Sequence, residues 1–304
     1  MNKKIVITGA SGFIGKHLWE YFEHHGHSII ACVSNNEINS STYLIHNILL
    51  PSSQFEVLLE KEKPDFLIHC AGSASVSESF LDTQKDFFKN VVVTDFVLNS
   101  LRNYSPLTKM IFLSSAAVYG NPSELPITLN TTQKPISPYG FHKMLCEINC
   151  KKYHQLFGTS ITIARIFSVF GPRLKKQILW DIYQKACHSK TVTLNGTGNE
   201  TRDFIYITDL AIVIHQLIKY SSFDANTINI ATGRETTIRD LATELLAQLG
   251  EVKQLCFDGK SRLGDPMRWP IDLKDSPIFE DIVWMPLARG VQHYVDWISG
   301  VDEQ

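Results

Sequence analysis

The sequence lacks the features that mark several protein classes. Its 29 basic and 31 acidic side chains leave a net charge of −2, too balanced for the broad positive field that attracts nucleic acid or anionic lipid. No run of 18 apolar residues occurs, and glycines soon interrupt the apolar run after Lys4, which excludes a membrane span and a signal peptide. We therefore expect a cytoplasmic protein with no nucleic-acid or membrane partner.

Cysteine pairs and low-complexity segments are also missing. The six cysteines are scattered and none forms a Cys-x-x-Cys pair, which predicts reduced thiols and no metal site. The 17 glycines and 12 prolines are spread along the chain, and hydrophobic residues make up 44% of it, as in globular proteins. The 304 residues suffice for one large domain or two closely associated lobes.

Strand-like and helix-like segments alternate through the first half of the chain. The strand-like segments are rich in Val, Ile and Phe and show little polar alternation, which is typical of strands covered on both faces. They span residues 4–8, 28–33, 66–70, 110–114 and 160–166, and helical spacing marks residues 13–25, 80–102 and 139–157. This alternation predicts an α/β fold with a doubly wound parallel sheet.

Beyond Ile166 the chain breaks into shorter pieces at glycines and prolines. A strand-like segment, 227–231, precedes an apolar-periodic helix, 238–249. We expect residues 1–166, with 207–232 returning to them, to form a nucleotide-binding domain. Residues 167–206 and 233–304 would then form a smaller, interleaved C-terminal substrate lobe.

Three glycines lie between the first strand and the first helix, in the segment Thr8 to Gly15. Glycine permits a tight turn and a close approach to a pyrophosphate, whose charge the helix N-terminus stabilises. The strand before the turn and the helix after it favour a Rossmann-type dinucleotide site over an ordinary strand-to-helix turn. The cofactor-binding residues predicted here are Gly9, Ser11, Gly12, Phe13, Ile14 and Gly15.

The second predicted strand ends without the acidic residue that bonds the adenosine ribose of NAD. Ser34 and Asn35 stand there instead. Neither side chain repels a 2′-phosphate, and both can donate hydrogen bonds to one. The sequence therefore favours NADP over NAD, although no arginine accompanies these residues.

Tyr139 and Lys143 stand four residues apart near the start of a predicted helix, so both lie on one helix face. A neighbouring ammonium stabilises a phenolate, which makes the tyrosine a usable general acid or base. Ser115 follows the strand 110–114, at the sheet edge where open α/β folds bind ligands. The spacing also fits surface residues of an amphipathic helix, and the serine a simple strand end.

Together these features resemble the extended short-chain dehydrogenase/reductase family, in its nucleotide-sugar epimerase, dehydratase and reductase branch. The resemblance covers nearly the whole chain, in residues 8–15, 65–72, 90–94, 114–120, Tyr139 with Lys143, 165–172, 196–209 and 262–266. It implies that Tyr139 transfers the proton, Lys143 bonds the nicotinamide ribose, and Ser115 positions the reacting sugar oxygen. Further cofactor contacts implied are Asn47, Ile48, Cys70, Ala71, Gly72, Asn90 and Phe167, and further substrate contacts are Val76, Ser168, Arg202 and Arg262.

The resemblance also narrows the range of reactions that the protein is expected to catalyse. Dehydratases of the family carry Thr-Asp-Glu where this chain has residues 114–116, and Ala116 can be neither acid nor base. Hydride transfer at one sugar carbon, most often C4, remains. With NADP favoured, we expect a nucleotide-sugar 4-ketoreductase of polysaccharide biosynthesis, with a 4-epimerase as the alternative. A non-catalytic NADP sensor would not need the Ser115, Tyr139 and Lys143 set.

The substrate and the assembly follow from the same resemblance. Arg202 and Arg262 are candidates to bind the nucleoside diphosphate, because guanidinium groups bond phosphate bidentately. Relatives often pair two long helices of the first lobe across a dimer axis. We expect a homodimer, with contributions from Phe87, Phe88, Val91 and Phe96, although the same residues would equally serve packing on the sheet.

Overall fold

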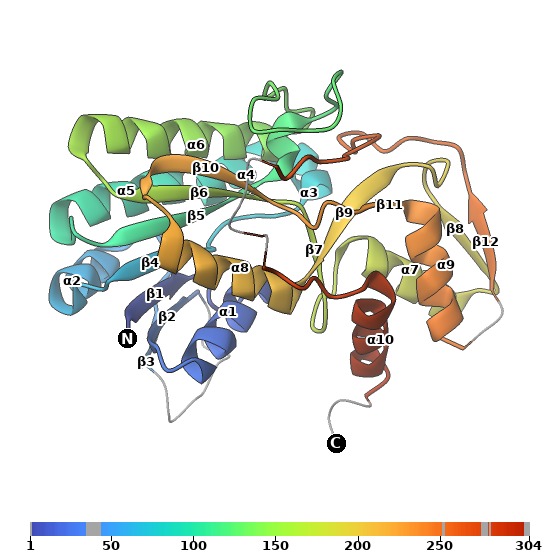
Figure 1. The fold of residues 1–304 in the computed structure, drawn as a ribbon, viewed down its shortest axis with the longest axis horizontal. Coiled ribbons are helices and arrows are strands. Elements are labelled where there is room, and N and C mark those ends of the chain that lie inside the picture. The colour runs from blue at the N-terminus through green and yellow to red at the C-terminus, as the bar shows by residue number, and fades with distance from the viewer. Residues whose placement is uncertain (1, 35–43, 251–252, 275–278, 280, 301–304) are drawn as a thin grey trace. The chain divides into compact units, whose positions relative to one another are not determined.

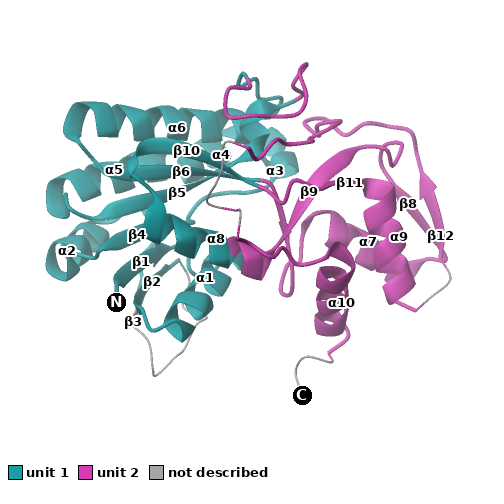
Figure 2. Cartoon of the chain, in the orientation of Figure 1, with its two compact units in different colours: residues 1–120, 132–166, 211–230 teal, residues 121–131, 167–210, 231–304 magenta. Residues whose placement is uncertain are grey.

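The computed structural model describes residues 2–34, 44–250, 253–274, 279 and 281–300. The chain folds into two compact units (Figure 2). The first consists of residues 1–120, 132–166 and 211–230, and the second of residues 121–131, 167–210 and 231–304. The segment 121–131 belongs to the second unit, although nothing in its sequence separates it from its neighbours.

A seven-stranded parallel sheet forms the centre of the first unit (Figure 1). Its strands are β1 (Lys4–Thr8), β2 (Ser28–Val33), β3 (Leu44–Asn47), β4 (Phe66–His69), β5 (Lys109–Ser115), β6 (Ile161–Ile166) and β10 (Asp224–Ile230). Their order is β10-β6-β5-β4-β1-β2-β3. The chain leaves β1 on one side and returns at β4 on the other, which creates the switch point where such sheets bind ligands. The predicted doubly wound parallel sheet is confirmed.

Apolar residues run through the strands because helices cover both faces of the sheet. Every residue of β4 and of β6 is buried. Helices α2 (Ser53–Glu62), α5 (Val93–Tyr104) and α6 (Pro138–Phe157) pack on one face, and α1 (Phe13–His24) and α8 (Ile207–Tyr220) lie on the other (Figure 1). Each large apolar side chain buried in this way stabilises the fold by about 1.5–3 kcal/mol, so the sheet is a rigid platform.

The single helix predicted over residues 80–102 is wrong. The structure has α3 (Val76–Leu81), α4 (Thr83–Phe87), a π-helical stretch η1 (Phe88–Val92) and then α5. Asp82 ends α3 and caps α4, because its carboxylate accepts a hydrogen bond from the Lys85 N–H at 2.9 Å. Apolar spacing alone does not reveal a boundary that is set by a side-chain cap.

The described residues of the second unit form two small sheets, packed with helices that lie wholly within this unit. One sheet joins β7 (Ser168–Phe170), β9 (Thr201–Tyr206) and β11 (Glu235–Thr237), and the other pairs β8 (Thr191–Leu194) with β12 (Gln254–Phe257). The helices are α7 (Gln177–His188), α9 (Ile238–Gln248) and α10 (Leu287–Ile298). No helix in the described part of either unit is long and apolar enough to cross a membrane.

A buried carboxylate organises the second unit. Asp203 on β9 accepts hydrogen bonds from the Thr232 N–H at 2.8 Å and from the Arg234 N–H at 3.0 Å. Burial raises its pKa to about 6, although these hydrogen bonds lower it. The carboxylate therefore fixes the turn at residues 232–234 against β9.

A chain of three side chains crosses the first unit beneath the turn that follows β1. Thr8 Oγ1 lies 2.7 Å from His69 Nδ1, and His69 Nε2 lies 3.2 Å from Thr94 Oγ1. Thr8 Oγ1 also accepts a hydrogen bond from the Ala71 N–H at 3.3 Å. Burial, with the charge of Lys143 as a smaller cause, lowers the pKa of His69 to about 3. The neutral imidazole thus ties β1, β4 and α5 together.

Lowering the pH should destabilise the folded protein, because protonation of the buried His69 is unfavourable. An unfolded histidine binds a proton near pH 6.5, whereas His69 does so only near pH 3 in the folded chain. Between these values the unfolded state binds more protons, so the free energy of unfolding falls as the pH falls, by up to about 1.4 kcal/mol per pH unit. Urea titrations from pH 7.5 to 4.5 measure this loss.

His69→Gln is the informative variant in that experiment. It should have a lower free energy of unfolding at pH 7.5 than the wild type, and a shallower loss on acidification. The control is His24→Gln, at an exposed position on α1. An acid loss in His69→Gln as steep as in the wild type would contradict the assignment.

Candidate active site

The glycine turn after β1 leaves no room for side chains. Gly9 has φ +66°, and a Cβ there would lie 2.7 Å from the Ala71 backbone nitrogen. A Cβ at Gly15 would lie 2.3 Å from the Gly9 carbonyl oxygen. The turn is closed by a hydrogen bond from the Gly12 N–H to the Gly9 carbonyl at 3.0 Å. Any larger residue at Gly9 or Gly15 would force the backbone apart.

The start of α1 fits an anion. Gly12 is the N-cap residue, it provides no side-chain cap, and the first turn carries no acidic residue. The N–H groups of this turn are therefore available to an external acceptor. An uncapped helix N-terminus behind a tight glycine turn fits the pyrophosphate of a dinucleotide. The predicted contacts Ser11, Phe13 and Ile14 all lie in this turn or in the first residues of α1.

The segment after β4 closes against η1. Cys70 and Ala71 follow the strand, and a Cβ at Gly72 would lie 2.8 Å from the Asn90 Oδ1. Burial raises the pKa of the Cys70 thiol to about 12, and the Lys143 charge lowers it in part. The thiol is therefore protonated and unreactive, and this segment offers a closely packed backbone surface next to the glycine turn.

The strand ends predicted to meet the adenosine are also placed. Ser34 is exposed directly after β2, and exposed Asn47 ends β3 as the register partner of Val33. Ile48 is buried and its N–H donates to the Val33 carbonyl at 2.8 Å. The fourth predicted residue, Asn35, lies outside the described residues. The ends of β2 and β3 therefore lie side by side in the sheet.

Ser115 ends β5 at the carboxyl edge of the sheet. Its Oγ accepts a hydrogen bond from the Ala117 N–H at 3.1 Å and so begins the 3₁₀ helix η2 (Ala116–Tyr119). A Cβ at Gly140 would lie 2.5 Å from the Ala117 carbonyl oxygen. Because Gly140 has no side chain, the first turn of α6 packs directly on η2. This brings the turn that carries Tyr139 next to the element that begins at Ser115.

Tyr139 and Lys143 are both buried in the first two turns of α6, with 8% and 7% exposed. The Lys143 ammonium donates to the Leu113 carbonyl on β5 at 2.9 Å and lies 4.9 Å from the centre of the Phe112 ring. The structure therefore holds the lysine against β5, two residues before Ser115. The three predicted catalytic residues come from adjoining elements of one unit.

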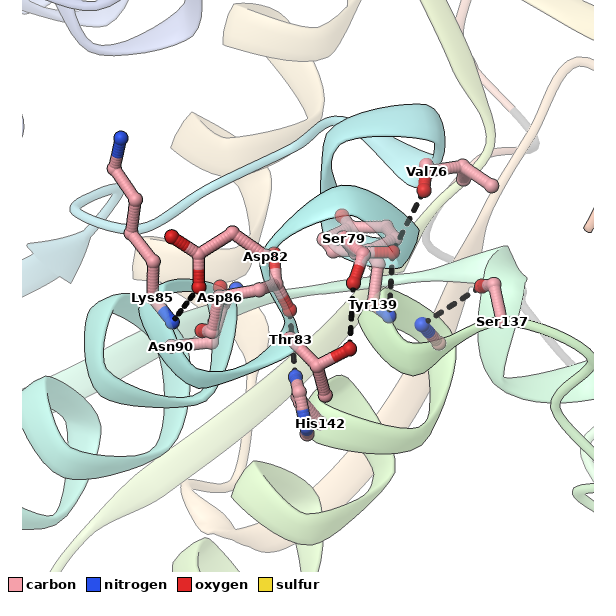
Figure 3. Close-up of polar contacts among 11 residues, drawn as sticks. Val76, Ser79, Asp82, Thr83, Lys85, Asp86, Asn90, Ser137, Tyr139 and His142 are labelled. Carbon is pink, nitrogen blue, oxygen red and sulfur yellow. Dashed lines mark hydrogen bonds and ion pairs between the residues drawn. The ribbon is translucent and has the colours of Figure 1, made fainter.

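A contact that the sequence does not indicate anchors Tyr139. Ser79 on α3 accepts a hydrogen bond from the Tyr139 N–H at 3.2 Å and donates to the Val76 carbonyl at 2.7 Å (Figure 3). Ser137 caps the same helix by accepting from the Gly140 N–H at 3.1 Å. The Ser79 hydroxyl thus links the backbone of Val76, a predicted substrate residue, to the backbone of Tyr139, the candidate proton donor. No local pattern in the sequence indicates a hydrogen-bond partner that lies 60 residues before Tyr139 in the chain.

A buried polar network is centred on Glu147, which lies one helical turn after Lys143 on α6. Glu147 accepts from Arg165 Nε at 2.9 Å and Nη2 at 2.7 Å, and from the Ser114 hydroxyl at 2.6 Å. Arg165 also donates to the Tyr119 hydroxyl, which donates to Asn229 Oδ1, each at 2.7 Å. Burial lowers the pKa of Arg165, but the hydrogen bonds and charge of Glu147 outweigh it and raise the pKa. The network joins α6 to β5, β6, η2 and β10.

The remaining predicted residues belong to the second unit. Phe167 is buried and its ring meets the Trp269 ring edge-on, with centroids 5.7 Å apart. Ser168 begins β7, and its backbone pairs with Phe204 on β9. These two residues therefore belong to the packed part of the second unit that continues from β6.

The charges of Arg202 and Arg262 both act on one carboxylate of the second unit, that of Asp265. Arg202 Nη1 donates to the Pro266 carbonyl at 2.7 Å, and its guanidinium lies 5.3 Å from the centre of the Trp269 ring. Burial raises the pKa of Asp265, and the charges of Arg202 and the exposed Arg262 lower it. Glu200 acts on both Arg202 and Asp265, so two guanidinium groups and two carboxylates balance one another in this cluster.

Known proteins match this chain over most of its length. The model of the NAD dependent epimerase/dehydratase family matches residues 5–231. GDP-6-deoxy-D-mannose reductase of Pseudomonas aeruginosa is 29% identical over 317 residues, which cover 100% of both chains. UDP-glucose 4-epimerase of Mycolicibacterium smegmatis is 25% identical over 313 residues, 97% of this chain and 98% of its own.

A solved structure is similar over the same length. UDP-glucuronic acid 4-epimerase from Bacillus cereus, in complex with UDP-glucuronic acid and NAD, matches with a TM-score of 0.87 and 25% identity. The match covers 98% of this chain and 99% of that one.

Gly15→Ala should weaken NADH binding at least about tenfold, because the added methyl group would lie 2.3 Å from the Gly9 carbonyl oxygen and displace the turn from the pyrophosphate. Fluorescence titration with NADH measures the Kd. Gly158→Ala is the control, since φ is +69° there and nothing lies within 4 Å, so it costs only about 1–2 kcal/mol of backbone strain. An unchanged Kd in Gly15→Ala would exclude this turn as the cofactor site.

Proposed function

The chain belongs to the NAD-dependent epimerase/dehydratase family, and from that premise we propose that it is a nucleotide-sugar 4-epimerase. The family comprises NAD-dependent nucleotide-sugar epimerases, dehydratases and reductases. The observation that carries the proposal is the buried pair Tyr139 and Lys143 on the first two turns of α6, which Lys143 joins to β5 two residues before Ser115. Such a set performs proton transfer at a sugar hydroxyl whose carbon is oxidised and reduced.

The choice of reaction rests on Ala116 and on the relatives. Ala116 is fully buried and provides neither the acid nor the base that an elimination needs, which disfavours a dehydratase. Two of the full-length matches, from Mycolicibacterium smegmatis and Bacillus cereus, are 4-epimerases, and the second was solved with NAD. They favour the 4-epimerase over the 4-ketoreductase, which is the reaction expected from the sequence.

The 4-ketoreductase stays as the second candidate because two observations favour it. The reductase of Pseudomonas aeruginosa is 29% identical over its full length. Ser34, not an acid, follows β2, and this position would accept the 2′-phosphate of NADP. NAD is the cofactor of the proposed epimerase, and NADP that of the reductase.

The residues present would perform the proton steps as follows. When bound, a nicotinamide cofactor would supply the hydride acceptor and donor for the reacting carbon. Tyr139 takes the proton from the C4 hydroxyl during oxidation and returns it during reduction. The Lys143 ammonium, held by the Leu113 carbonyl at 2.9 Å, stabilises the phenolate that is present before the proton is taken and after it is returned. Ser115 donates a hydrogen bond to the same sugar oxygen and so fixes its position.

Binding would use the backbone and the arginine cluster. Gly9, Gly12 and Gly15 and the start of α1 would hold the cofactor pyrophosphate, and Asn47 and Ile48 would lie at its adenine. Arg202 and Arg262, which both lie in the second unit, would bind the nucleoside diphosphate of the substrate. This division needs no broad positive field, which accords with the net charge of −2.

Tyr139→Phe should lower kcat about 10²- to 10⁴-fold and leave the Kd for NADH within about threefold, because the variant loses only the proton-transferring hydroxyl. Steady-state kinetics and NADH titration measure the two effects. Tyr153→Phe, on the same helix and also buried, should keep nearly full activity. A Tyr139→Phe enzyme with more than about a tenth of the wild-type kcat would refute the proton role.

A substrate panel separates the two candidate functions. UDP-, dTDP- and GDP-linked hexoses and their 4-keto derivatives are incubated with NAD or NADPH and followed at 340 nm and by NMR. The epimerase predicts inversion at C4 of a nucleotide hexose with no net change in absorbance. Stoichiometric oxidation of NADPH by a 4-keto sugar would instead establish the reductase.

We also propose that the protein forms a homodimer through α4, η1 and α6. An apolar surface, consisting of Phe87, Phe88, Phe141 and Ile148, is exposed on these elements. This surface extends over adjacent helices. We therefore propose a second copy of the chain as its partner. Val91 and Phe96 do not belong to it: Val91 lies in the core cluster and Phe96 packs against that cluster.

Phe88→Glu should convert the dimer to a monomer at micromolar concentration, because it places a charge in an apolar interface. Light scattering after size-exclusion chromatography measures the mass. Leu107→Glu is the matched control, since Leu107 is 91% exposed but lies after α5, away from this surface. A monomeric wild type would refute the proposed dimer.

A further inference from the structure

An acid–imidazole pair joins α4 to the helix that carries the candidate catalytic residues (Figure 3). His142 Nδ1 lies 2.6 Å from Asp86 Oδ2, and the two residues are only 5% and 3% exposed. A carboxylate can only accept, so the imidazole donates from Nδ1. His142 precedes Lys143 and follows Tyr139 by three residues, so all three lie on one side of α6.

We infer that Asp86 and His142 are positioning residues for the proton-transfer pair. Their hydrogen bond fixes the rotation and height of the first two turns of α6 against α4. Tyr139 and Lys143 are thereby kept in register with Ser115 and the end of β5. The kinetic part of this inference rests on the proposed function, whereas the positional part rests on the contacts alone.

The segment that supplies Asp86 is itself well anchored. The Thr83 hydroxyl donates to the Ser79 carbonyl at 2.9 Å, which joins α4 to α3 across the break at Asp82. The Asn90 amide donates to the Asp86 carbonyl at 3.1 Å, within the passage into η1. Asp86 therefore approaches His142 from a short, braced helix, and a shift of α6 would have to stretch their hydrogen bond.

This segment holds α6 at two points. Ser79 accepts from the backbone of Tyr139 at 3.2 Å, and Asp86 accepts from the side chain of His142 at 2.6 Å. Two contacts, three residues apart on the helix, restrain both translation and rotation of its first turn. Lys143 adds a third point through its hydrogen bond to the Leu113 carbonyl. The candidate catalytic turn is thus attached on both sides.

The pair does more than fill space. Within the described residues, the second carboxylate oxygen of Asp86 is buried and has no hydrogen-bond partner. The acid therefore depends on His142, and removal of the imidazole would leave a buried carboxylate unpaired, which is strongly unfavourable. The Phe87 ring meets the imidazole edge-on at 5.4 Å and covers it. A charge-assisted hydrogen bond in such surroundings is directional, whereas apolar packing alone would let α6 slide.

Another ion pair on α6 supplies the comparison. Lys152 lies 3.6 Å from Asp95 on α5, and their side chains are 45% and 46% exposed. Exposed pairs of this kind contribute little, and this one lies more than two helical turns beyond Lys143. Its removal changes a charge on α5 without disturbing the first turns of α6.

The test compares truncating and conservative variants at both positions. Asp86→Ala and His142→Ala remove the hydrogen bond. Asp86→Asn keeps an acceptor oxygen, and His142→Asn places an amide N–H where Nδ1 stands. Asp95→Asn is the control. The measurements are kcat, KM, the Kd for NADH and the primary deuterium isotope effect with substrate labelled at C4.

Misplacement predicts a loss in the chemical step. The alanine variants should lower kcat about 10- to 100-fold, with KM and the Kd for NADH within about threefold and a larger isotope effect than the wild type. The asparagine variants should recover most of kcat, and the double alanine variant should lose no more than either single one. Wild-type kcat and isotope effect in the alanine variants would overturn the inference, as would asparagine variants as impaired as alanine.

Hydrogen exchange tests the positional part without any substrate. Backbone amides of residues 139–143 should exchange at least about tenfold faster in His142→Ala than in the wild type or Asp95→Asn. Unchanged exchange would overturn the inference. If Asp86→Ala does not fold, the contrast between His142→Ala and His142→Asn decides it. If the wild type acts on no nucleotide sugar, the proposed function fails while the exchange result still decides the role of the pair.

Discussion

The close contact of α6 with β5 and with η2, which follows that strand, is the constraint on which the candidate active site depends. Gly140 permits it, because a Cβ there would lie 2.5 Å from the Ala117 carbonyl oxygen. Lys143 uses it, because its ammonium reaches the Leu113 carbonyl at 2.9 Å. A tyrosine and a lysine four residues apart become a chemical pair only when their helix lies this close to the sheet edge.

Buried polar contacts then hold α6 in place along its length. Ser79 and Asp86 restrain its first turn, and Glu147 binds Arg165 further along. Buried charges of this kind contribute little net stability, since their desolvation offsets their attraction. Their effect is to select one position of the helix, and that position brings Tyr139 and Lys143 to the carboxyl edge of the sheet.

The parts of the structure that depend on local pattern could be predicted from the sequence. Apolar strands, the glycine turn at Gly9 and the four-residue spacing of Tyr139 and Lys143 are such patterns, and the doubly wound sheet followed from them. The break at Asp82 and the pairing of Asp86 with His142, 56 residues apart, could not be predicted, because they depend on which side chains the fold brings together.

In the proposed reaction, Tyr139 takes and returns the proton of the C4 hydroxyl while hydride leaves and returns at C4 of a nucleotide hexose. Incubation of a C4-deuterated UDP-hexose with enzyme and NAD, followed by NMR of the product, tests it most directly. A 4-epimerase of this kind should give an inverted C4 that retains the deuterium, because the same hydride leaves and returns. Inversion with loss of deuterium to solvent, or recovery of unchanged hexose from every UDP sugar tried, would contradict it.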